Sequence, residues 1–211
     1  QGQPSWELRS NRIDLAVTQQ GGHLAPVVFD RRGRRIQPFH ISPFWREKWP
    51  ASVPPIIQVL RGDFFCLPFG GNAQPFRGER HLPHGEPASG CWNFVSKESS
   101  DGCHALTLQM PLRVRSGRMT KRVMLRDGED VVYQEHLISG MTGPNCPGHH
   151  PNLQFRSQGR IAISPFLWGS TYPHLMERPE EQSYCGIKPG VTFRTLGKVP
   201  LIYGGESDLS I

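Results

Sequence analysis

A long run of alternating apolar and polar residues, from 92 to 140, restricts the fold more than any other feature of the sequence. Short glycine-containing segments interrupt it at residues 100–102, 116–117 and 127–128. Period-two alternation is typical of half-buried strands, and such short segments are typical of hairpin turns. The run therefore predicts a meander of about four antiparallel strands.

The rest of the chain also favours strands over helices. In residues 12–18, Ile13, Leu15 and Val17 alternate with polar or small residues, and residues 27–39 and 153–164 each suggest a hairpin. Gly (23) and Pro (20) make up about a fifth of the 211 residues, which is typical of a turn-rich protein. No convincing amphipathic helix is found. We predict an all-β fold, a large antiparallel β-sandwich that forms a single domain over residues 1–211.

Charge and cysteine usage limit the class of partner. The net charge is +6, but the basic residues are dispersed, and their densest cluster, at 30–36, is expected to be a solvated hairpin tip, so no nucleic-acid partner is predicted. No apolar stretch approaches the roughly 20 residues of a membrane span. Five widely spaced cysteines without a CxxC motif favour a reducing, cytoplasmic location. Gln1 is not a start methionine, so a removed export signal is the alternative.

Two segments rich in glycine and proline carry the most suggestive histidines. They are HLPHGEPASGCWNF at 81–94, which is not expected to be helical, and GPNCPGHHPNLQF at 143–155. Loops at strand ends often hold functional groups, and imidazole exchanges protons near neutral pH. We expect His84 and His150 to face the same cavity and to serve in acid–base chemistry.

The sequence also offers residues for two other kinds of site. Zinc takes sulfur and nitrogen ligands, which Cys146, His149 and His150 offer. However, adjacent residues of an extended segment point to opposite faces, so the two histidines are not expected to share an ion, and no metal is predicted. Cys66 has apolar neighbours, which favours packing over a role as a nucleophile.

The order of the motifs resembles that of a known family. A Gly-Gly turn at 21–22 precedes RGDFFCLPFG at 61–70, then a His-Gly pair at 84–85 before a tryptophan strand, then GHHPNLQF at 148–155. Over about residues 6–155 this resembles the aldose 1-epimerase (mutarotase) superfamily, and most closely its hexose-6-phosphate mutarotase branch. The resemblance implies a galactose mutarotase-like β-supersandwich that interconverts sugar anomers.

The resemblance also implies roles for individual residues. His150 matches the histidine that protonates the ring oxygen of the sugar, and His84 matches the histidine that hydrogen-bonds the substrate. Arg61 matches an arginine that contacts the sugar, and Asp208 is the candidate for an aspartate that binds sugar hydroxyls. The reaction needs one acid and one base on opposite sides of the anomeric carbon, and no metal or organic cofactor.

The sequence departs from the family in two respects. The catalytic base of the family is a glutamate that would lie beyond Ile211, so we expect the domain to be truncated at its C-terminus. The arginine that follows the His-Gly motif in the family is absent, and Glu86 in that region would repel a phosphate. A phosphorylated substrate is therefore not favoured.

Aromatic residues near these motifs are candidates for stacking on a sugar face. Trp45, Trp49 and Phe69 lie in loops, where a flat ring can pack on the C–H groups of a pyranose. Trp92 begins a strand and is expected to belong to the core.

Three hypotheses follow for the function. The first is an aldose 1-epimerase-like enzyme that acts on a small-molecule sugar with His150 as general acid. The second is a non-catalytic carbohydrate-binding protein on the same fold, and the third is a structural β domain without a ligand. The identity of the sugar and the oligomeric state do not follow from the sequence.

Overall fold

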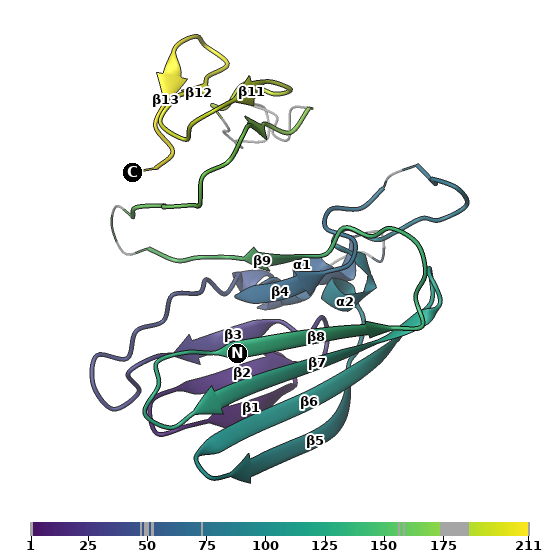
Figure 1. Ribbon diagram of the computed structural model, residues 1–211, viewed down its shortest axis with the longest axis vertical. Coiled ribbons are helices and arrows are strands. Elements are labelled where there is room, and N and C mark those ends of the chain that lie inside the picture. The colour runs from purple at the N-terminus through teal and green to yellow at the C-terminus, as the bar shows by residue number, and fades with distance from the viewer. Residues whose placement is uncertain are drawn as a thin grey trace. The chain divides into compact units, whose positions relative to one another are not determined.

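The computed structural model describes residues 2–46, 48, 51, 53–72, 74–155, 157, 159–173 and 186–210, without the side chains of residues 44 and 45. The chain divides into two compact units, residues 1–154 and 155–211, and each is described by itself. Figure 1 shows the strands and helices of both units. The single domain that the sequence suggests over residues 1–211 stays a prediction.

The first unit contains a five-stranded antiparallel sheet in the order β1-β2-β3-β4-β9. Its strands are β1 (Ser5–Arg9), β2 (Asp14–Thr18), β3 (Leu24–Val28), β4 (Asp63–Cys66) and β9 (Gly148–Pro151). The alternation predicted for residues 12–18 is confirmed, since Leu15 and Val17 of β2 are buried. Antiparallel pairing places β9, from late in this unit, directly beside β4.

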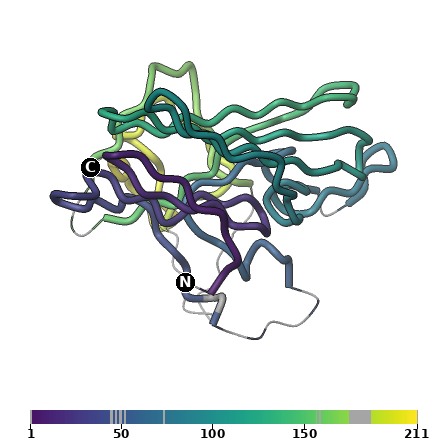
Figure 2. The backbone as a smooth tube through the Cα atoms, turned by 90° about the horizontal axis from the view of Figure 1, so that it is seen from below, coloured from purple at the N-terminus to yellow at the C-terminus, as the bar shows by residue number. Residues whose placement is uncertain are grey.

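A second sheet in the same unit is a four-stranded antiparallel meander. Its strands, β5 (Asn93–Ser100), β6 (Cys103–Leu112), β7 (Gly117–Arg126) and β8 (Tyr133–Ser139), pair in sequence order. Figure 2 shows these teal and green strands running alongside one another. The predicted meander is therefore confirmed, including its turns at 101–102 and 127–128.

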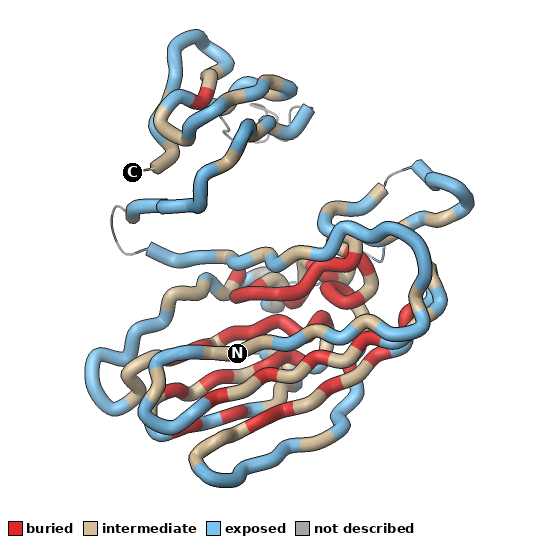
Figure 3. Tube along the Cα trace, in the orientation of Figure 1, coloured by how far each residue is buried: buried red, intermediate tan, exposed pale blue. Residues whose placement is uncertain are grey.

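The two sheets pack face to face around one hydrophobic core. Leu15, Val17 and Leu24 from the first sheet join Leu106 and Val123 from the second in one buried cluster. Figure 3 shows buried positions along both sheets. The fold is an all-β antiparallel sandwich, as predicted. Trp92 belongs to this core, and its Nε1 donates to the Pro87 carbonyl over 3.0 Å.

Among the described residues, three short helices lie outside the sheets, namely the 3-10 helix η1 (Pro43–Arg46), α1 (Pro55–Val59) and α2 (Gly85–Ser89). The expectation that residues 81–94 contain no helix is wrong, because α2 forms one turn there. Pro87 is tolerated because it lies in the first turn, where a backbone N–H has no partner within the helix.

The described residues of the second unit form two small antiparallel pairs. These are β10 (Gly169–Ser170) with β11 (Thr192–Phe193), and β12 (Val199–Pro200) with β13 (Glu206–Ser207). The hairpin expected at 153–164 is wrong, since the described residues of that segment form no strand. Residues 160–165 are exposed, and alternation stabilises a strand only where one face is buried.

Candidate functional site

The pairing of β4 with β9 organises the site. Phe64 lies opposite His150, and Phe65 lies opposite His149. Residues directly opposite each other in an antiparallel pair project from the same face of the sheet. His149 and His150 therefore project from opposite faces, as the sequence predicts, and each meets different neighbours.

On one face, His150 meets His84. Their ring centroids are 4.8 Å apart, with an edge-to-face angle of 79°. Phe64 stacks on His150 at 4.8 Å, and the Phe69 ring lies 5.7 Å from His84 and 5.9 Å from His150. Strand β9 and the start of α2, which are distant in the sequence, thus bring their imidazoles into contact. We call His84 and His150 the histidine pair.

Backbone geometry orients His84. It has a left-handed φ of 61° and lies at the start of α2. Its carbonyl accepts a hydrogen bond of 3.2 Å from Leu67 N, and its N–H donates to the Gly70 carbonyl. Gly85 has a φ of 77°, and a Cβ there would collide with the Leu67 carbonyl, so only glycine fits. The turn that holds His84 is therefore closely fitted to the segment that carries Phe69.

The histidine pair has unused hydrogen-bonding capacity. The Nδ1 atoms of His84 and His150 are both buried and have no hydrogen-bond partner. Burial, followed by repulsion from His150, lowers the pKa of His84, which keeps its ring neutral at pH 7. An unpaired buried polar atom costs free energy that a ligand hydroxyl can recover.

Behind Phe64, His23 and Arg61 form a supporting layer. The His23 ring stacks on Phe64 at 4.4 Å, and its Nε2 donates to the Ala88 carbonyl over 2.9 Å. Its Nδ1 accepts from Arg61 N over 3.4 Å. Burial lowers the pKa of His23 to about 3, so this ring is neutral.

Arg61 is 2% exposed, and its Nε donates to the Val59 carbonyl over 3.0 Å. Burial lowers the pKa of its guanidinium. Arg61 is therefore a buried residue of the first unit whose side chain bonds to the backbone. Its contact with a sugar stays a prediction.

Three other expected side chains lie outside the described part of the first unit. The Trp45 side chain and the whole of Trp49 lie outside the described residues. Asp208 belongs to the second unit, where its carboxylate accepts hydrogen bonds from the N–H and hydroxyl of Ser210. Its role in binding sugar hydroxyls stays a prediction.

On the opposite face of β4 and β9, polar side chains cluster between the two sheets. Asp63 Oδ2 accepts from His149 Nδ1 over 2.8 Å and from Gln134 Nε2 over 2.7 Å. Lys121 is buried nearby, and its Nζ donates to the Gly22 carbonyl over 2.7 Å. The His136 ring stacks on Phe65 at 4.1 Å and meets His149 edge to face. We call Asp63, Gln134, His136, His149 and Lys121 the inter-sheet cluster.

Burial shifts the ionisation of this cluster. It lowers the pKa of His136 to about 3 and that of Lys121 to about 8. Burial alone would raise the pKa of Asp63, but hydrogen bonds from His149 and Gln134 outweigh it, so that pKa lies below its usual value. The cluster therefore holds the Asp63 carboxylate beside the neutral imidazole of His136.

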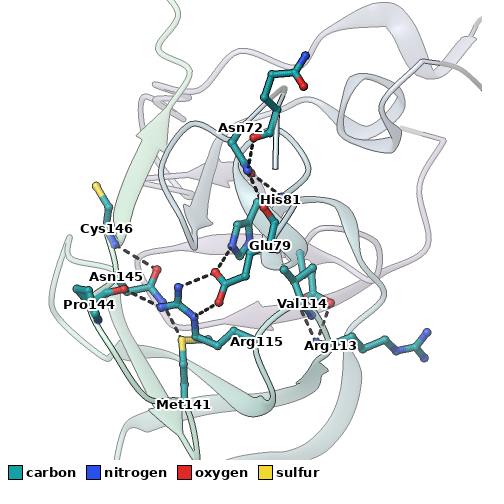
Figure 4. A network of polar contacts seen from close by, with 12 residues as sticks. Asn72, Glu79, His81, Arg113, Val114, Arg115, Met141, Pro144, Asn145 and Cys146 are labelled. Atoms are coloured by element: carbon teal, nitrogen blue, oxygen red, sulfur yellow. Dashed lines mark hydrogen bonds and ion pairs between the residues drawn. The ribbon is translucent and has the colours of Figure 1, made fainter. Parts of the chain in front are cut away.

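A cavity of about 720 Å³ opens beside Phe69. Glu79 and Arg115 face each other there in a two-pronged ion pair with distances of 3.0 and 2.6 Å, and His81 Nε2 lies 3.1 Å from the same carboxylate. Figure 4 shows the Arg115 guanidinium between Glu79 and the Pro144 carbonyl. We call this cavity the side pocket. Its lining includes Phe69, Phe76, Arg77, Glu79, His81 and Arg115.

Neither of the alternative chemistries gains support from the geometry. Among the described residues, no group of three or more His, Cys, Asp or Glu side chains is placed to hold a metal ion. Cys66 is fully buried, and burial raises the pKa of its thiol to about 12, which suits packing and not nucleophilic attack. None of the helices in the described ranges has the length and apolar character that a membrane crossing requires.

Sequence reasoning missed the inter-sheet cluster and the side pocket. Lys121 and His136 occupy ordinary positions in an alternating meander, and nothing local marks them as buried partners of Asp63. Glu79 and Arg115 lie in separate turns. One local signal was present, because Arg77-Gly78 is a plausible two-residue hairpin turn between Phe76 and Glu79.

Comparison with known proteins supports the fold alone. No family model matches the chain, and no curated protein matches it. A solved structure, the Slr1438 protein from Synechocystis sp. PCC 6803, is similar with a TM-score of 0.54 and 13% sequence identity. The match covers 81% of this chain and 59% of Slr1438, so the chain spans less than two thirds of that protein.

Proposed function

We propose that the protein is an aldose 1-epimerase-like enzyme that interconverts the anomers of a small-molecule sugar, with His150 as general acid. The observation that carries this proposal is the histidine pair itself. Two half-buried imidazoles from distant segments, one at the start of α2 and one on β9, meet at 4.8 Å, and each has a buried, unpartnered Nδ1. The ring of His23, by contrast, has both of its nitrogens in hydrogen bonds.

The chemistry requires little from the protein beyond position. His150 gives a proton to the ring oxygen of the sugar while a base removes the proton from the C1 hydroxyl, and the bond between C1 and the ring oxygen breaks. The open-chain aldehyde rotates about its C1–C2 bond, and the ring then closes on the other face of C1. His84 hydrogen-bonds the sugar and holds it against Phe69, whose ring is 45% exposed and suited to the C–H face of a pyranose.

Anomer exchange in freshly dissolved α-glucose and α-galactose, followed by polarimetry, tests this proposal. We expect the wild type to speed equilibration and His150→Ala to lower that acceleration about 100-fold, the usual order for loss of a general acid. His104→Ala is the matched control, because His104 lies in the second sheet and bonds to Ser99 and Asp127. Equal rates for wild type, His150→Ala and buffer alone would refute catalysis on these sugars.

One observation favours a second candidate, a carbohydrate-binding protein without catalysis. Within the described part of the chain, no carboxylate is hydrogen-bonded to either ring of the histidine pair, so the base for the C1 hydroxyl is unassigned. A binder would be stabilised by sugar through mass action and would not speed anomer exchange. A sugar-dependent rise in melting temperature at an uncatalysed exchange rate identifies this case.

A further inference from the structure

The second unit leaves large apolar side chains uncovered. Val199 is the one described residue of this unit that is buried, and Figure 3 shows its other described positions as exposed or intermediate. The adjacent side chains of Leu167 and Trp168 are 88% and 64% exposed. Neighbouring apolar side chains at a surface are typical of a site that contacts another molecule.

These two side chains belong to a defined patch at the end of a strand pair. They line a cavity of about 540 Å³ together with Thr192, Phe193 and Arg194. Gly169 of β10 lies opposite Phe193 of β11, so the residues next to this pair, Trp168 and Arg194, lie side by side. We call Leu167, Trp168, Phe193 and Arg194 the Trp168 patch.

Close packing fixes the backbone under the Trp168 patch. The Phe193 ring lies against Gly169, where a Cβ would come within 2.6 Å of the ring. Phe166 meets Phe193 edge to face, with ring centroids 6.1 Å apart. Just beyond the strand pair, Thr171 N donates to the Val191 carbonyl over 2.9 Å. The patch is therefore a preformed surface on a hydrogen-bonded frame.

The charge of the Trp168 patch is positive. Arg194 is exposed, and among the described residues that line the cavity none is acidic. The sequence contains no Asp or Glu between Glu135 and Glu177, the stretch that supplies Leu167 and Trp168. Such a surface attracts an anionic partner. A second copy of the chain fits less well, because an isologous contact would bring Arg194 against the Arg194 of the other copy.

We propose that the Trp168 patch is a membrane-contact site that binds the surface of an anionic lipid bilayer. Trp168 would lie at the level of the headgroups, where tryptophan is favoured because its ring is apolar and its N–H is polar. Leu167 would insert among the acyl chains, and Arg194 would pair with lipid phosphates. The patch contains no residue of the histidine pair, so this contact is independent of the proposed function.

Co-sedimentation of the full chain with vesicles of phosphatidylcholine containing about 30% phosphatidylglycerol tests the proposal. We expect the protein to bind these vesicles about fivefold more tightly than pure phosphatidylcholine vesicles. Leu167→Ala should weaken binding to the anionic vesicles about tenfold, the usual order for one leucine withdrawn from an apolar environment. Leu137→Ala is the matched control, because Leu137 is another exposed leucine, on β8, and its loss should change binding by less than about twofold.

A pair of arginine variants separates the Trp168 patch from the net charge of +6. Arg194→Gln should weaken binding to the anionic vesicles about fivefold, the usual order for one basic residue near such a surface. Arg32→Gln removes the same charge from an exposed turn of the first unit and should change binding by less than about twofold. Equal losses in the two variants would overturn the proposal, since net charge alone would then explain the binding.

Tryptophan fluorescence provides a second readout. A blue shift on addition of anionic vesicles that Trp168→Phe removes would support the proposal. No binding to these vesicles, or equal binding by Leu167→Ala and Leu137→Ala, would overturn it, provided that both variants keep the wild-type melting temperature, as their exposed positions predict. Self-association without lipid that Leu167→Ala abolishes would also overturn it, because the patch would then bind a second copy of the chain.

Discussion

The two faces of the β4–β9 pair are built from alternate residues of the same two strands, yet they differ in chemistry. One face carries His150 against Phe64 and His84, with unpartnered ring nitrogens. The other carries His149 against Asp63 in a 2.8 Å hydrogen bond. The difference shows that the covering of a strand, and not the strand itself, decides what a histidine can do.

Different elements cover the two faces of the β4–β9 pair. The face with the histidine pair is covered by short helices and loops, with Ile56 of α1 and Ala88 of α2 packed beside Phe64. The opposite face is covered by the second sheet, which contributes Lys121 and His136. Loops leave room for a ligand. The second sheet instead supplies polar partners from the protein itself, such as Gln134, whose Nε2 donates to Asp63.

The largest expected effect is a loss of stability on the face that carries the inter-sheet cluster. We expect Asp63→Ala to lower the free energy of unfolding by about 3 kcal/mol, because it leaves Lys121 buried without its countercharge and removes the acceptor of His149 and Gln134. Urea denaturation measures the loss. Asp14→Ala, which removes a half-exposed carboxylate paired with arginines, should cost about 1 kcal/mol or less. Equal losses in the two variants would contradict the closed character of the cluster.

Substituting each of the two adjacent histidines in turn tests whether the two faces have different roles. His150→Gln should lower the acceleration of anomer exchange about 100-fold, because glutamine keeps polarity but cannot deliver a proton. His149→Gln should leave that rate within about twofold and should lower the free energy of unfolding by about 1 kcal/mol through the weakened bond to Asp63. Polarimetry and urea denaturation on both variants test the contrast, and a reversed pattern would show that the roles are assigned to the wrong faces.

The dependence of stability on pH sharpens the comparison further. The pKa of His136 falls from 6.5 in the unfolded chain to about 3 in the fold, so the unfolded state binds a proton first as the pH drops. The stabilisation that neutral His136 gives the fold is therefore present above pH 6.5 and is lost below it. The free energy of unfolding should fall by about 2 kcal/mol between pH 7 and pH 5. His136→Phe, which keeps a ring against Phe65, should reduce the loss measured by urea denaturation at these two pH values. His104→Phe is the control on a partly exposed histidine of the same sheet, and a similar reduction there would contradict the assignment to His136.

The smallest expected effect concerns the placement of Phe69. A Cβ at Gly148 would lie 2.6 Å from the Phe69 ring, so Gly148→Ala should displace that ring. We expect about a threefold slower anomer exchange, with the free energy of unfolding changed by less than about 1 kcal/mol. Polarimetry beside urea denaturation provides both values. An unchanged rate would indicate that Phe69 does not contact the sugar.

Much of the fold could be predicted because it depends on local patterns. The meander of β5 to β8 follows from alternation and glycine turns, and the opposite orientation of His149 and His150 follows from strand geometry alone. The one-turn helix α2 could not be predicted, because its formation depends on the contact of His84 and Gly85 with the Leu67 carbonyl and the Gly70 turn.

For the site, the sequence by itself determined which residues can exchange protons near neutral pH and which segments carry them. The closeness of His84 to His150, the burial of Arg61 and the pairing of Glu79 with Arg115 were decided only by the tertiary structure. The physical reason is the distance along the chain over which each effect acts. Alternation and turn chemistry act over a few neighbouring residues, whereas pKa shifts, unpartnered atoms and cavities arise where distant segments pack together and exclude water.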